Sequence, residues 1–305
     1  MIYSLGKPFC DWLDVTYAPL DCPYPDLNTL LLGCGFVPSN ELGSGRTYRT
    51  PNGRGTVRVK HSKRFAKISL SGSSLTHLRF CGHWTELLSI LASSPHKVSR
   101  LDLAMDLPMD AAPFMDALDA RYPLGLVNLS RKAQAVTRFV STRADGVRSG
   151  TWYVGHKDDA RQSLRVYDKS LQMLQEYGEV IPTTTRVEVT ARKDRGATLR
   201  DAEQPDALFW DIAAPSVFKR APEGTPVWQP NQDTHWLSQP PSFVPAEVLK
   251  RRIEHSAELD AFLTLADSIG PYGVAYLERL LLDRLRNRTD ALGSTSEPST
   301  HSSAA

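Results

Sequence analysis

One stretch of this sequence alternates charged and apolar side chains so regularly that it restricts the fold more than any other feature. Between residues 100 and 107 every second residue is Leu or Met, and the residues between them are charged or small. Side chains two residues apart lie on the same face of a β-strand, so the stretch predicts a strand with one core face and one charged face. The charged face would carry Arg100, Asp102, Ala104 and Asp106.

A second stretch, residues 184–192, has the same design. One face would carry Arg186, Glu188, Thr190 and Arg192, and the valines between them would face the core. If the two strands share a sheet, they bring two or three carboxylates together within a ring of guanidinium groups. Mg²⁺ or Mn²⁺ prefers such carboxylates and completes its shell with phosphate and water, and guanidinium groups match phosphate geometry. The alternative is a solvated face on which Arg and Asp pair with one another.

A third stretch, residues 164–169, places a tyrosine between two cations. Arg165, Tyr167 and Lys169 would share a face. Tyrosine is a poor nucleophile at its usual pKa of about 10, but flanking cations and a metal-polarised phosphate would favour the phenolate. The alternative is structural packing. Tyr153 competes for the role of nucleophile, but its neighbours carry no charge, so Tyr167 is the better candidate.

Positive charge is concentrated in residues 46–67, which hold eight Lys or Arg and no Asp or Glu, in a chain whose net charge is +2. Such a local field indicates a polyanionic partner. Residues 51–55, Pro-Asn-Gly-Arg-Gly, predict a hairpin turn, a shape that can lie along a DNA duplex and contact phosphates. The alternative is a solvated basic face. The candidate DNA-binding residues are Arg54, Arg58, Lys60, Lys63, Arg64 and Lys67.

The order of the expected elements predicts an α+β fold with a large, mainly antiparallel, curved sheet. We expect strands over 11–17, 47–49, 55–60, 65–70, 98–107, 138–141, 151–154, 164–168 and 184–192, and helices over 26–34, 75–91, 112–121 and 169–177. Because helices follow strands in a similar order twice, the sheet should consist of two related halves. We assign residues 1–200 to this domain, 201–245 to a proline-rich linker, 246–289 to a small C-terminal helical element and 290–305 to a disordered tail.

Several motifs are absent from the sequence. It has no His-x-His motif and no Gly-x-x-x-x-Gly-Lys-Ser/Thr phosphate loop, which argues against a histidine-based metal site and an intrinsic helicase. No apolar run approaches the length of a membrane span. The four cysteines form no Cys-x-x-Cys pair, and we expect reduced thiols in a cytoplasmic protein.

Four motifs together resemble the replication initiation factor family, which comprises rolling-circle initiators of filamentous phages and related trans-acting plasmid Rep proteins. The motifs are Arg-Leu-Asp-Leu-Ala-Met-Asp (100–106), Thr-Trp-Tyr-Val-Gly (151–155), Arg-Val-Tyr-Asp-Lys (165–169) and Arg-Val-Glu-Val-Thr-Ala-Arg (186–192). The resemblance spans residues 11–200 with order and spacing preserved. Residues 156–163 depart from the small Gly-Ser-rich pattern of the family, and the region after residue 200 shows no resemblance.

The resemblance implies a site-specific DNA nickase that starts rolling-circle replication in a bacterial host cell. Tyr167 would be the nucleophile, with Arg165 and Lys169 beside it. Mg²⁺ or Mn²⁺ would be the cofactor. Its ligands would be Asp102, Glu188 and Asp106, and Arg100, Arg186 and Arg192 would hold phosphates.

The expected partners are origin DNA, as duplex and single strand, a host helicase and a host polymerase. Apolar periodicity in the last helices favours packing or a homodimer. The rival hypothesis is a non-catalytic, sequence-specific DNA-binding protein on the same fold, such as a repressor or packaging factor.

Overall fold

The computed structural model describes residues 6–39, 45–127, 135–142, 148–155, 161–192 and 195–230. All of them belong to one compact unit, Met1–Pro241. The predicted C-terminal helical element (246–289) and disordered tail (290–305) lie outside the described residues, and the domain boundaries stay predictions. Within the described residues, no helix has the length and apolar character needed to cross a membrane.

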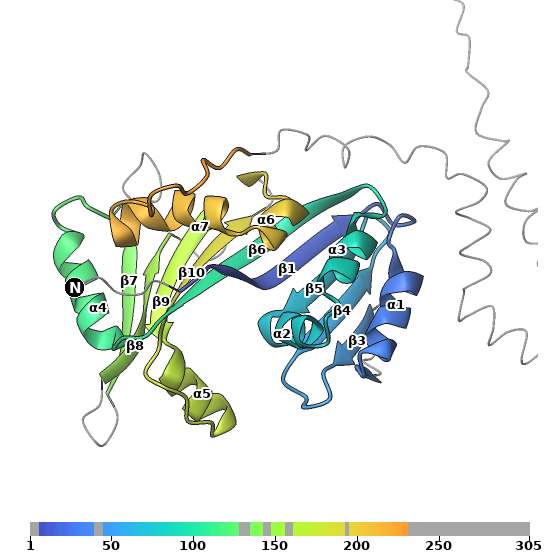
Figure 1. The fold of residues 1–305 in the computed structure, drawn as a ribbon, viewed down its shortest axis with the longest axis horizontal. Helices are drawn as coiled ribbons and strands as arrows, with labels where there is room; N and C mark the ends of the chain where they lie inside the picture. Colours follow the sequence, from blue (N-terminus) through green and yellow to red (C-terminus); the bar gives the residue numbers. More distant parts are fainter. Residues whose placement is uncertain are drawn as a thin grey trace, which may run out of the picture. The chain divides into compact units, whose positions relative to one another are not determined.

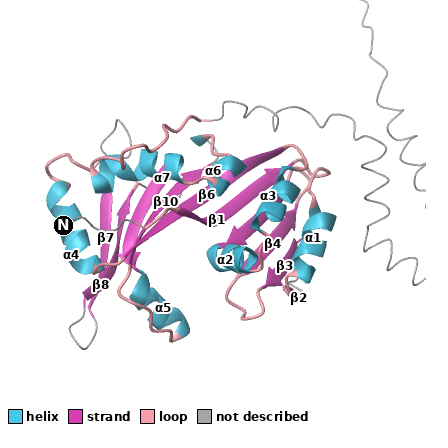
Figure 2. Ribbon diagram, viewed as in Figure 1, coloured by secondary structure: helices cyan, strands magenta, loops and turns pink. Residues whose placement is uncertain are grey.

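A ten-stranded antiparallel sheet organises the described chain (Figure 1), in the order β2-β3-β4-β5-β1-β6-β10-β9-β8-β7. The strands are β1 (Phe9–Tyr17), β2 (Val37–Ser39), β3 (Gly45–Arg49), β4 (Thr56–His61), β5 (Ala66–Ser71), β6 (His96–Leu107), β7 (Val136–Thr142), β8 (Arg148–Val154), β9 (Gln162–Asp168) and β10 (Thr185–Arg192). Helices accompany the sheet (Figure 2). They are α1 (Tyr24–Gly33), α2 (Gly72–Phe80), α3 (Trp84–Ala92), α4 (Ala111–Arg121), α5 (Lys169–Tyr177), α6 (Leu199–Glu203), α7 (Asp206–Ala213) and the π-helical η2 (Ala214–Phe218). The predicted α+β fold with a large antiparallel sheet is confirmed.

The sheet consists of two halves that follow the same path. In each half a long strand is followed by a helix and then by further strands, and the last strand returns to pair with the first. The N-terminal half runs from β1 to α3, and the C-terminal half from β6 to η2. Two helices follow the returning strand in both halves, α2 and α3 in one and α6 and α7 in the other. The halves join where β1 pairs with β6, and only the C-terminal half has a helix, α5, before its returning strand.

Alternation along the central strands gives the sheet a core face and a polar face. Leu101, Leu103 and Met105 of β6 and Val187 and Val189 of β10 are completely buried in the hydrophobic core. Helices α2, α4, α6 and α7 pack against the sheet and contribute the other side of this core. The charged residues predicted to share a face therefore lie together on the opposite side, which we call the polar face.

Local signals explain most element boundaries. Residues 51–55 form the turn between β3 and β4, as predicted, and Gly53 there has a φ of +74°. Asp168 caps α5 by accepting a hydrogen bond from the amide of Leu171 at 2.9 Å, and α5 ends at Gly178 with a φ of +66°. Both agree with the sequence prediction.

Three regions differ from the prediction. Strand β2 (Val37–Ser39) was not predicted. The single helix expected over 75–91 is two helices, because the chain turns at Gly82, which has a φ of +79°. Helices α6 and α7 were not predicted and fall partly within the segment assigned to the proline-rich linker. Pro205 directly precedes α7, and proline suits a helix start. Phe209 and Trp210 bury their rings in the core, so residues up to 218 contribute to the fold.

Candidate active site on the polar face

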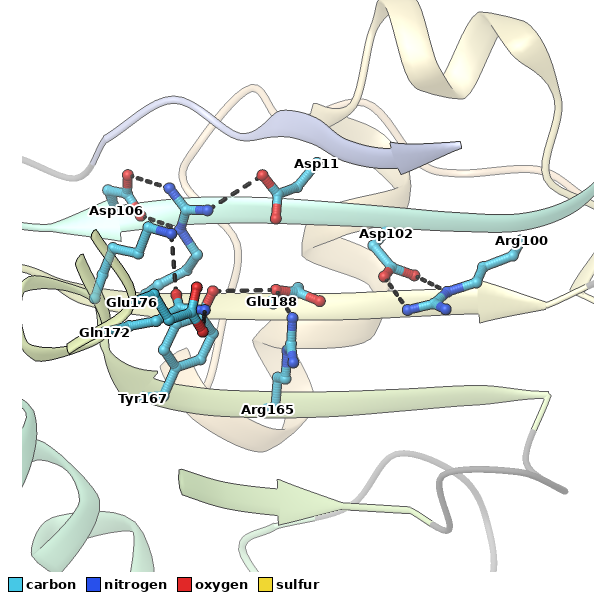
Figure 3. Close-up of polar contacts among 11 residues, drawn as sticks. Asp11, Arg100, Asp102, Asp106, Arg165, Tyr167, Gln172, Glu176 and Glu188 are labelled. Atoms are coloured by element: carbon cyan, nitrogen blue, oxygen red, sulfur yellow. Dashed lines mark hydrogen bonds and ion pairs between the residues drawn. The ribbon is translucent and has the colours of Figure 1, made fainter. Parts of the chain in front are cut away.

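The three stretches singled out in the sequence are adjacent strands at the centre of the sheet, in the order β6-β10-β9. Their register places Asp106, Arg186 and Tyr167 in one row across the polar face. The next row contains Glu188 and Arg165. The structure thus brings the predicted carboxylates, arginines and tyrosine into one cluster (Figure 3).

Glu188 lies at the centre of the cluster and is only 2% exposed. Its Oε2 accepts a hydrogen bond from Nη2 of Arg165 at 2.6 Å. Burial raises the pKa of Glu188 to about 7 against the opposing effect of Arg165, and the charges of Asp102 and Asp11 raise it further. A carboxyl group with a pKa near neutrality can exchange protons at physiological pH.

Tyr167 points along the polar face toward Glu188, as Figure 3 shows. Its hydroxyl donates to Oε2 of Glu188 over 3.4 Å, and the guanidinium of Arg165 lies 5.0 Å from its ring centroid. Burial and the charge of Glu188 raise the pKa of Tyr167, while Arg186 and Arg165 lower it. The two arginines lower the pKa of Tyr167 as predicted, but the effect of burial is larger. The phenol therefore keeps its proton, and it would need a proton acceptor to act as a nucleophile.

The other two predicted metal ligands are each paired with an arginine. Asp102, 2% exposed, accepts two hydrogen bonds from Arg100, from Nε at 2.9 Å and Nη2 at 2.5 Å. Asp106 accepts two from Arg186, at 2.6 and 2.8 Å. The internal Arg–Asp pairing, which is the alternative interpretation of the sequence, is thus present in the structure.

The remaining predicted residues border the cluster. Arg192 lies directly opposite Arg100 across β10 and β6. Lys169 is the first residue of α5, where the sequence predicted the helix to begin, so it does not share the strand face of Arg165 and Tyr167 as expected. Its ammonium donates to Gln172 at 3.0 Å. Burial and then the charge of Arg186 lower the pKa of Lys169.

Strand β1 supplies three polar residues that the sequence analysis did not include in the site. Asp11 accepts a hydrogen bond from Nη1 of Arg186 at 3.1 Å. Asp14 accepts from Nζ of Lys67 at 2.5 Å and from Nε1 of Trp12 at 2.7 Å. The alternation of Trp12 and Asp14 was visible in the sequence and could have identified them. Asp11 was not predictable in this way, because it is the extra residue of a β-bulge opposite β6, and a bulge redirects a side chain.

A divalent cation fits this cluster by its chemistry. Among the described residues, no three Asp, Glu, His or Cys side chains are arranged to hold a metal. Magnesium, however, is commonly held by one or two carboxylates plus substrate phosphates. Asp102 raises the pKa of Glu188, so their negative charges repel, and a cation between them would relieve that repulsion. The residues that fit are Asp102 and Glu188. Asp106 would first have to release Arg186.

The predicted DNA-binding residues lie in the N-terminal half. Arg58 and Lys60 on β4 are exposed and share the polar face, because Arg58 lies in one row with Ser69 and Asp14. Lys67 of β5 lies in the next row, opposite Lys60, and its ammonium contacts the carboxylate of Asp14. Lys63 and Arg64 are exposed in the turn before β5.

Arg54 pairs with a carboxylate of the C-terminal half. Its Nη1 lies 2.5 Å from Oε2 of Glu179, and its guanidinium lies 4.6 Å from the ring centroid of Tyr177. Arg54 therefore connects the β3–β4 turn to the segment after α5, and so connects the two halves.

Several solved structures are similar to this chain. No family model matches this sequence, and no curated protein is detectably similar. The structure is similar to that of a rolling circle replication initiator protein from Geobacillus stearothermophilus, with a TM-score of 0.48 and 18% sequence identity. The similarity covers 75% of this chain and 91% of that chain.

Proposed function

We propose that this chain is a metal-dependent, site-specific DNA nickase that initiates rolling-circle replication. The observation that carries the proposal is the contact of the Tyr167 hydroxyl with Glu188, in a cluster bordered by Arg165 and Arg186. The order of the sequence motifs, which resembles the replication initiation factor family, supports the same activity. The proposal treats the polar face as the surface on which a DNA strand lies.

The chemical step uses Tyr167 as the nucleophile. Its phenolic oxygen attacks the scissile phosphorus and passes its proton to Oε2 of Glu188. The bond between phosphorus and the 3′ oxygen breaks, and its electron pair stays on that oxygen, which takes a proton from water and becomes a 3′-OH. The 5′ phosphate remains on Tyr167 as a phosphotyrosyl ester. In the reverse step a 3′-OH attacks this ester, rejoins the strand and returns the phenol.

The cations of the cluster hold the phosphate and offset its charge during attack. Arg165 lies beside both Tyr167 and Glu188, and Arg186 lowers the pKa of Tyr167. Arg100 and Arg192 lie opposite each other, where like charges are unfavourable unless an anion lies near them. Lys169 adds a further charge at the start of α5. Arg100, Arg165 and Arg186 can exchange their carboxylate partners for phosphate oxygens, which guanidinium groups also bind in a bidentate way.

Asp102 and Glu188 would hold the Mg²⁺ or Mn²⁺ ion, which supplies Lewis-acid polarisation of the scissile phosphate. Glu188 contacts both Arg165 and Tyr167 through Oε2, which leaves its second oxygen for the cation. Asp106 is the third predicted ligand.

The basic residues of the N-terminal half would guide DNA toward this cluster. Arg58, Lys60 and Lys67 follow one another across β4 and β5 on the face that also carries Tyr167. Phosphate contacts there add salt-sensitive affinity without sequence specificity. The partners that follow are origin DNA, a host helicase to separate the strands and a host polymerase to extend the 3′-OH. A homodimer remains part of the prediction for the C-terminal helices.

The test is a nicking assay. The full chain is incubated with Mg²⁺ or Mn²⁺ and supercoiled DNA of the replicon that encodes it. We expect open circles and a protein–DNA adduct that protease removes. Mass spectrometry should locate the adduct on the peptide containing Tyr167. An adduct on Tyr153 would show that the nucleophile is wrong.

One observation favours a second candidate, a DNA-binding protein without chemistry. Glu188, Asp102 and Asp106 are each paired with an arginine, as a purely structural face would require. This candidate predicts that the chain shifts the same DNA in a gel but never opens it, with either metal.

A further inference from the structure

An exposed aromatic side chain lies on the outermost strand of the sheet, beside the candidate site. Phe139 on β7 is 61% exposed. The register pairs it with Thr151 of β8, and Thr151 pairs with Tyr167 of β9. Phe139 therefore lies in the row of the nucleophile on the polar face, two strands away, or about 10 Å between backbones.

The neighbouring Arg138 shows that the orientation of the Phe139 side chain is fixed by the alternation along β7. Arg138 points to the other side of β7, where it pairs with Asp116 and Asp119 of α4. Trp152 of β8, opposite Arg138, is fully buried and donates to the same Asp119 at 2.9 Å. Strand β7 is therefore held to the helices through alternate residues, and Phe139 is directed away from the core.

Tyr153 completes an aromatic pair with Phe139. The two ring centroids are 5.8 Å apart with an interplanar angle of 87°. Tyr153 lies directly opposite Arg165 of β9, which in turn lies opposite Glu188 of β10. Across the polar face the order is thus aromatic pair, then cation, then carboxylate. An edge-to-face pair leaves a ring face free for a further planar group.

We propose that Phe139 and Tyr153 form a stacking subsite for an unpaired nucleobase of single-stranded DNA, one or two nucleotides from the phosphate at Tyr167. The inference rests on the proposed function, since it takes the strand on the polar face to be the strand that is nicked. Proteins that bind single strands combine a cationic track with aromatic side chains on which bases stack. Here Arg165 provides the adjacent cation, and the aromatic pair extends the same face.

The nature of the occupant follows from charge and shape. An apolar peptide segment would place its uncharged backbone beside the guanidinium groups of Arg165 and Arg186. A single strand instead presents a flat ring to Phe139 and a phosphate to the arginines at the same time. A duplex cannot do this, because its bases are stacked on one another. The subsite would therefore favour the melted form of the origin over the paired form.

The test measures stacking in the absence of cleavage. Full-length Tyr167→Phe protein is titrated into a short oligothymidylate that carries a single 2-aminopurine, whose fluorescence is quenched on stacking. We expect quenching that Phe139→Ala abolishes, together with roughly tenfold weaker binding. Phe139→Trp should restore both. Val140→Ala is the matched control, because Val140 is 53% exposed on the same strand but points to the other face, and it should change binding less than twofold.

A second oligonucleotide separates base stacking from phosphate contact. An oligomer of the same length without bases should bind wild type and Phe139→Ala equally, because no ring is present to stack. If Phe139→Ala weakens the abasic oligomer as much as the normal one, or if Phe139→Leu keeps full quenching, the proposal is overturned. Circular dichroism confirms that each variant is folded. Phe139→Leu keeps the apolar volume if Phe139→Ala does not fold.

Failure of the stacking subsite can be distinguished from failure of the proposed nickase function. If wild type never nicks DNA yet quenches 2-aminopurine through Phe139, the nickase proposal fails and the subsite stands. If wild type nicks normally and Phe139→Ala binds and nicks like wild type, the nickase stands and the subsite fails.

Discussion

The two halves of the sheet share one path and differ in the chemistry of their polar faces. In the N-terminal half, β4 presents exposed Arg58 and Lys60. In the C-terminal half, the corresponding strand β9 presents Arg165 and Tyr167 against the buried Glu188 of β10. The comparison shows that one backbone arrangement supports a cationic surface when its polar face stays exposed. It supports a cluster of coupled charges when arginines cover buried carboxylates.

The halves also differ at the connection before the returning strand. In the N-terminal half, β4 and β5 are joined by a short turn that includes Lys63 and Arg64. In the C-terminal half, α5 occupies the same place and brings Lys169 to the end of β9. Strand β1 belongs to the first half but contributes Asp11 to the second. The candidate site therefore depends on the seam between β1 and β6.

The largest expected effect comes from removing Tyr167, the proposed nucleophile in the C-terminal half. Tyr167→Phe should lower nicking by about 10³-fold or more and eliminate the covalent adduct, while DNA binding in a gel-shift assay stays within a few-fold of wild type. Tyr153→Phe is the matched control and should keep the adduct. Normal nicking by Tyr167→Phe would mean that the chemistry lies elsewhere.

The next effect concerns Glu188, the proposed proton acceptor. Glu188→Gln keeps the shape of the side chain but removes its negative charge. We expect the nicking rate to fall by roughly 10²–10⁴-fold. In calorimetry, Glu188→Gln should bind Mg²⁺ more weakly than the wild type does. Thr190→Val, a change on the same face of β10, serves as the control. Equal activity of Glu188→Gln and wild type would contradict both assigned roles of Glu188.

A smaller effect should follow from neutralising the N-terminal half. In Arg58→Ala/Lys60→Ala, DNA affinity should fall and the slope of log affinity against log salt should decrease by about two. The nicking rate at saturating DNA should not change. Arg200→Ala/Arg220→Ala removes the same charge at exposed positions outside the basic segment. An equal loss of affinity in this control would show that net charge, rather than the polar face, determines binding.

Stability should depend on pH through Glu188. The pKa of Glu188 is raised in the folded chain, so the folded state binds this proton more tightly than the unfolded state. Its stabilising contribution is complete below about pH 4.5 and is lost as the pH rises to about 7. Thermal unfolding without divalent ions should show a melting temperature that falls by a few degrees across this window. Glu188→Gln should reduce the dependence, and its persistence would assign the titration to another group.

The smallest effect is expected at the contact between the halves. Arg54 and Glu179 are both more than a third exposed, and such pairs contribute about 0–1 kcal/mol. A double-mutant cycle of Arg54→Ala and Glu179→Ala in urea unfolding should give a coupling energy in this range, lower at high salt. A coupling well above it would mean that the halves are held together more firmly than this pair indicates.

The sequence predicted the parts of the fold that depend on local alternation and turn chemistry. Residues 51–55 formed the expected turn because Asn-Gly accommodates a positive φ. Alternation identified β6, β9 and β10, and their charged faces do meet. The order in which these strands pair was not predictable, because β6 and β10 are neighbours over a separation of about 80 residues that no local pattern records.

The candidate site was predictable only in part. Asp11 was missed because a bulge breaks the alternation of β1. The arginine partner of each carboxylate could not be assigned either, since Arg186 bonds Asp106 of another strand whereas Arg100 bonds Asp102 of its own. Helix α7 was missed because prolines indicated an extended chain, whereas Pro205 precedes a helix whose Phe209 and Trp210 complete the core.

The two outermost strands differ in their capacity to recruit another strand. Strand β2 has three residues, and Pro38 in its middle cannot donate a backbone hydrogen bond. Strand β7 has seven residues, Val136–Thr142, with no proline. Short edge strands that contain proline discourage edge-to-edge association, whereas longer edge strands without proline permit it. Self-association at high concentration, through added β-structure, should therefore proceed from β7 rather than β2.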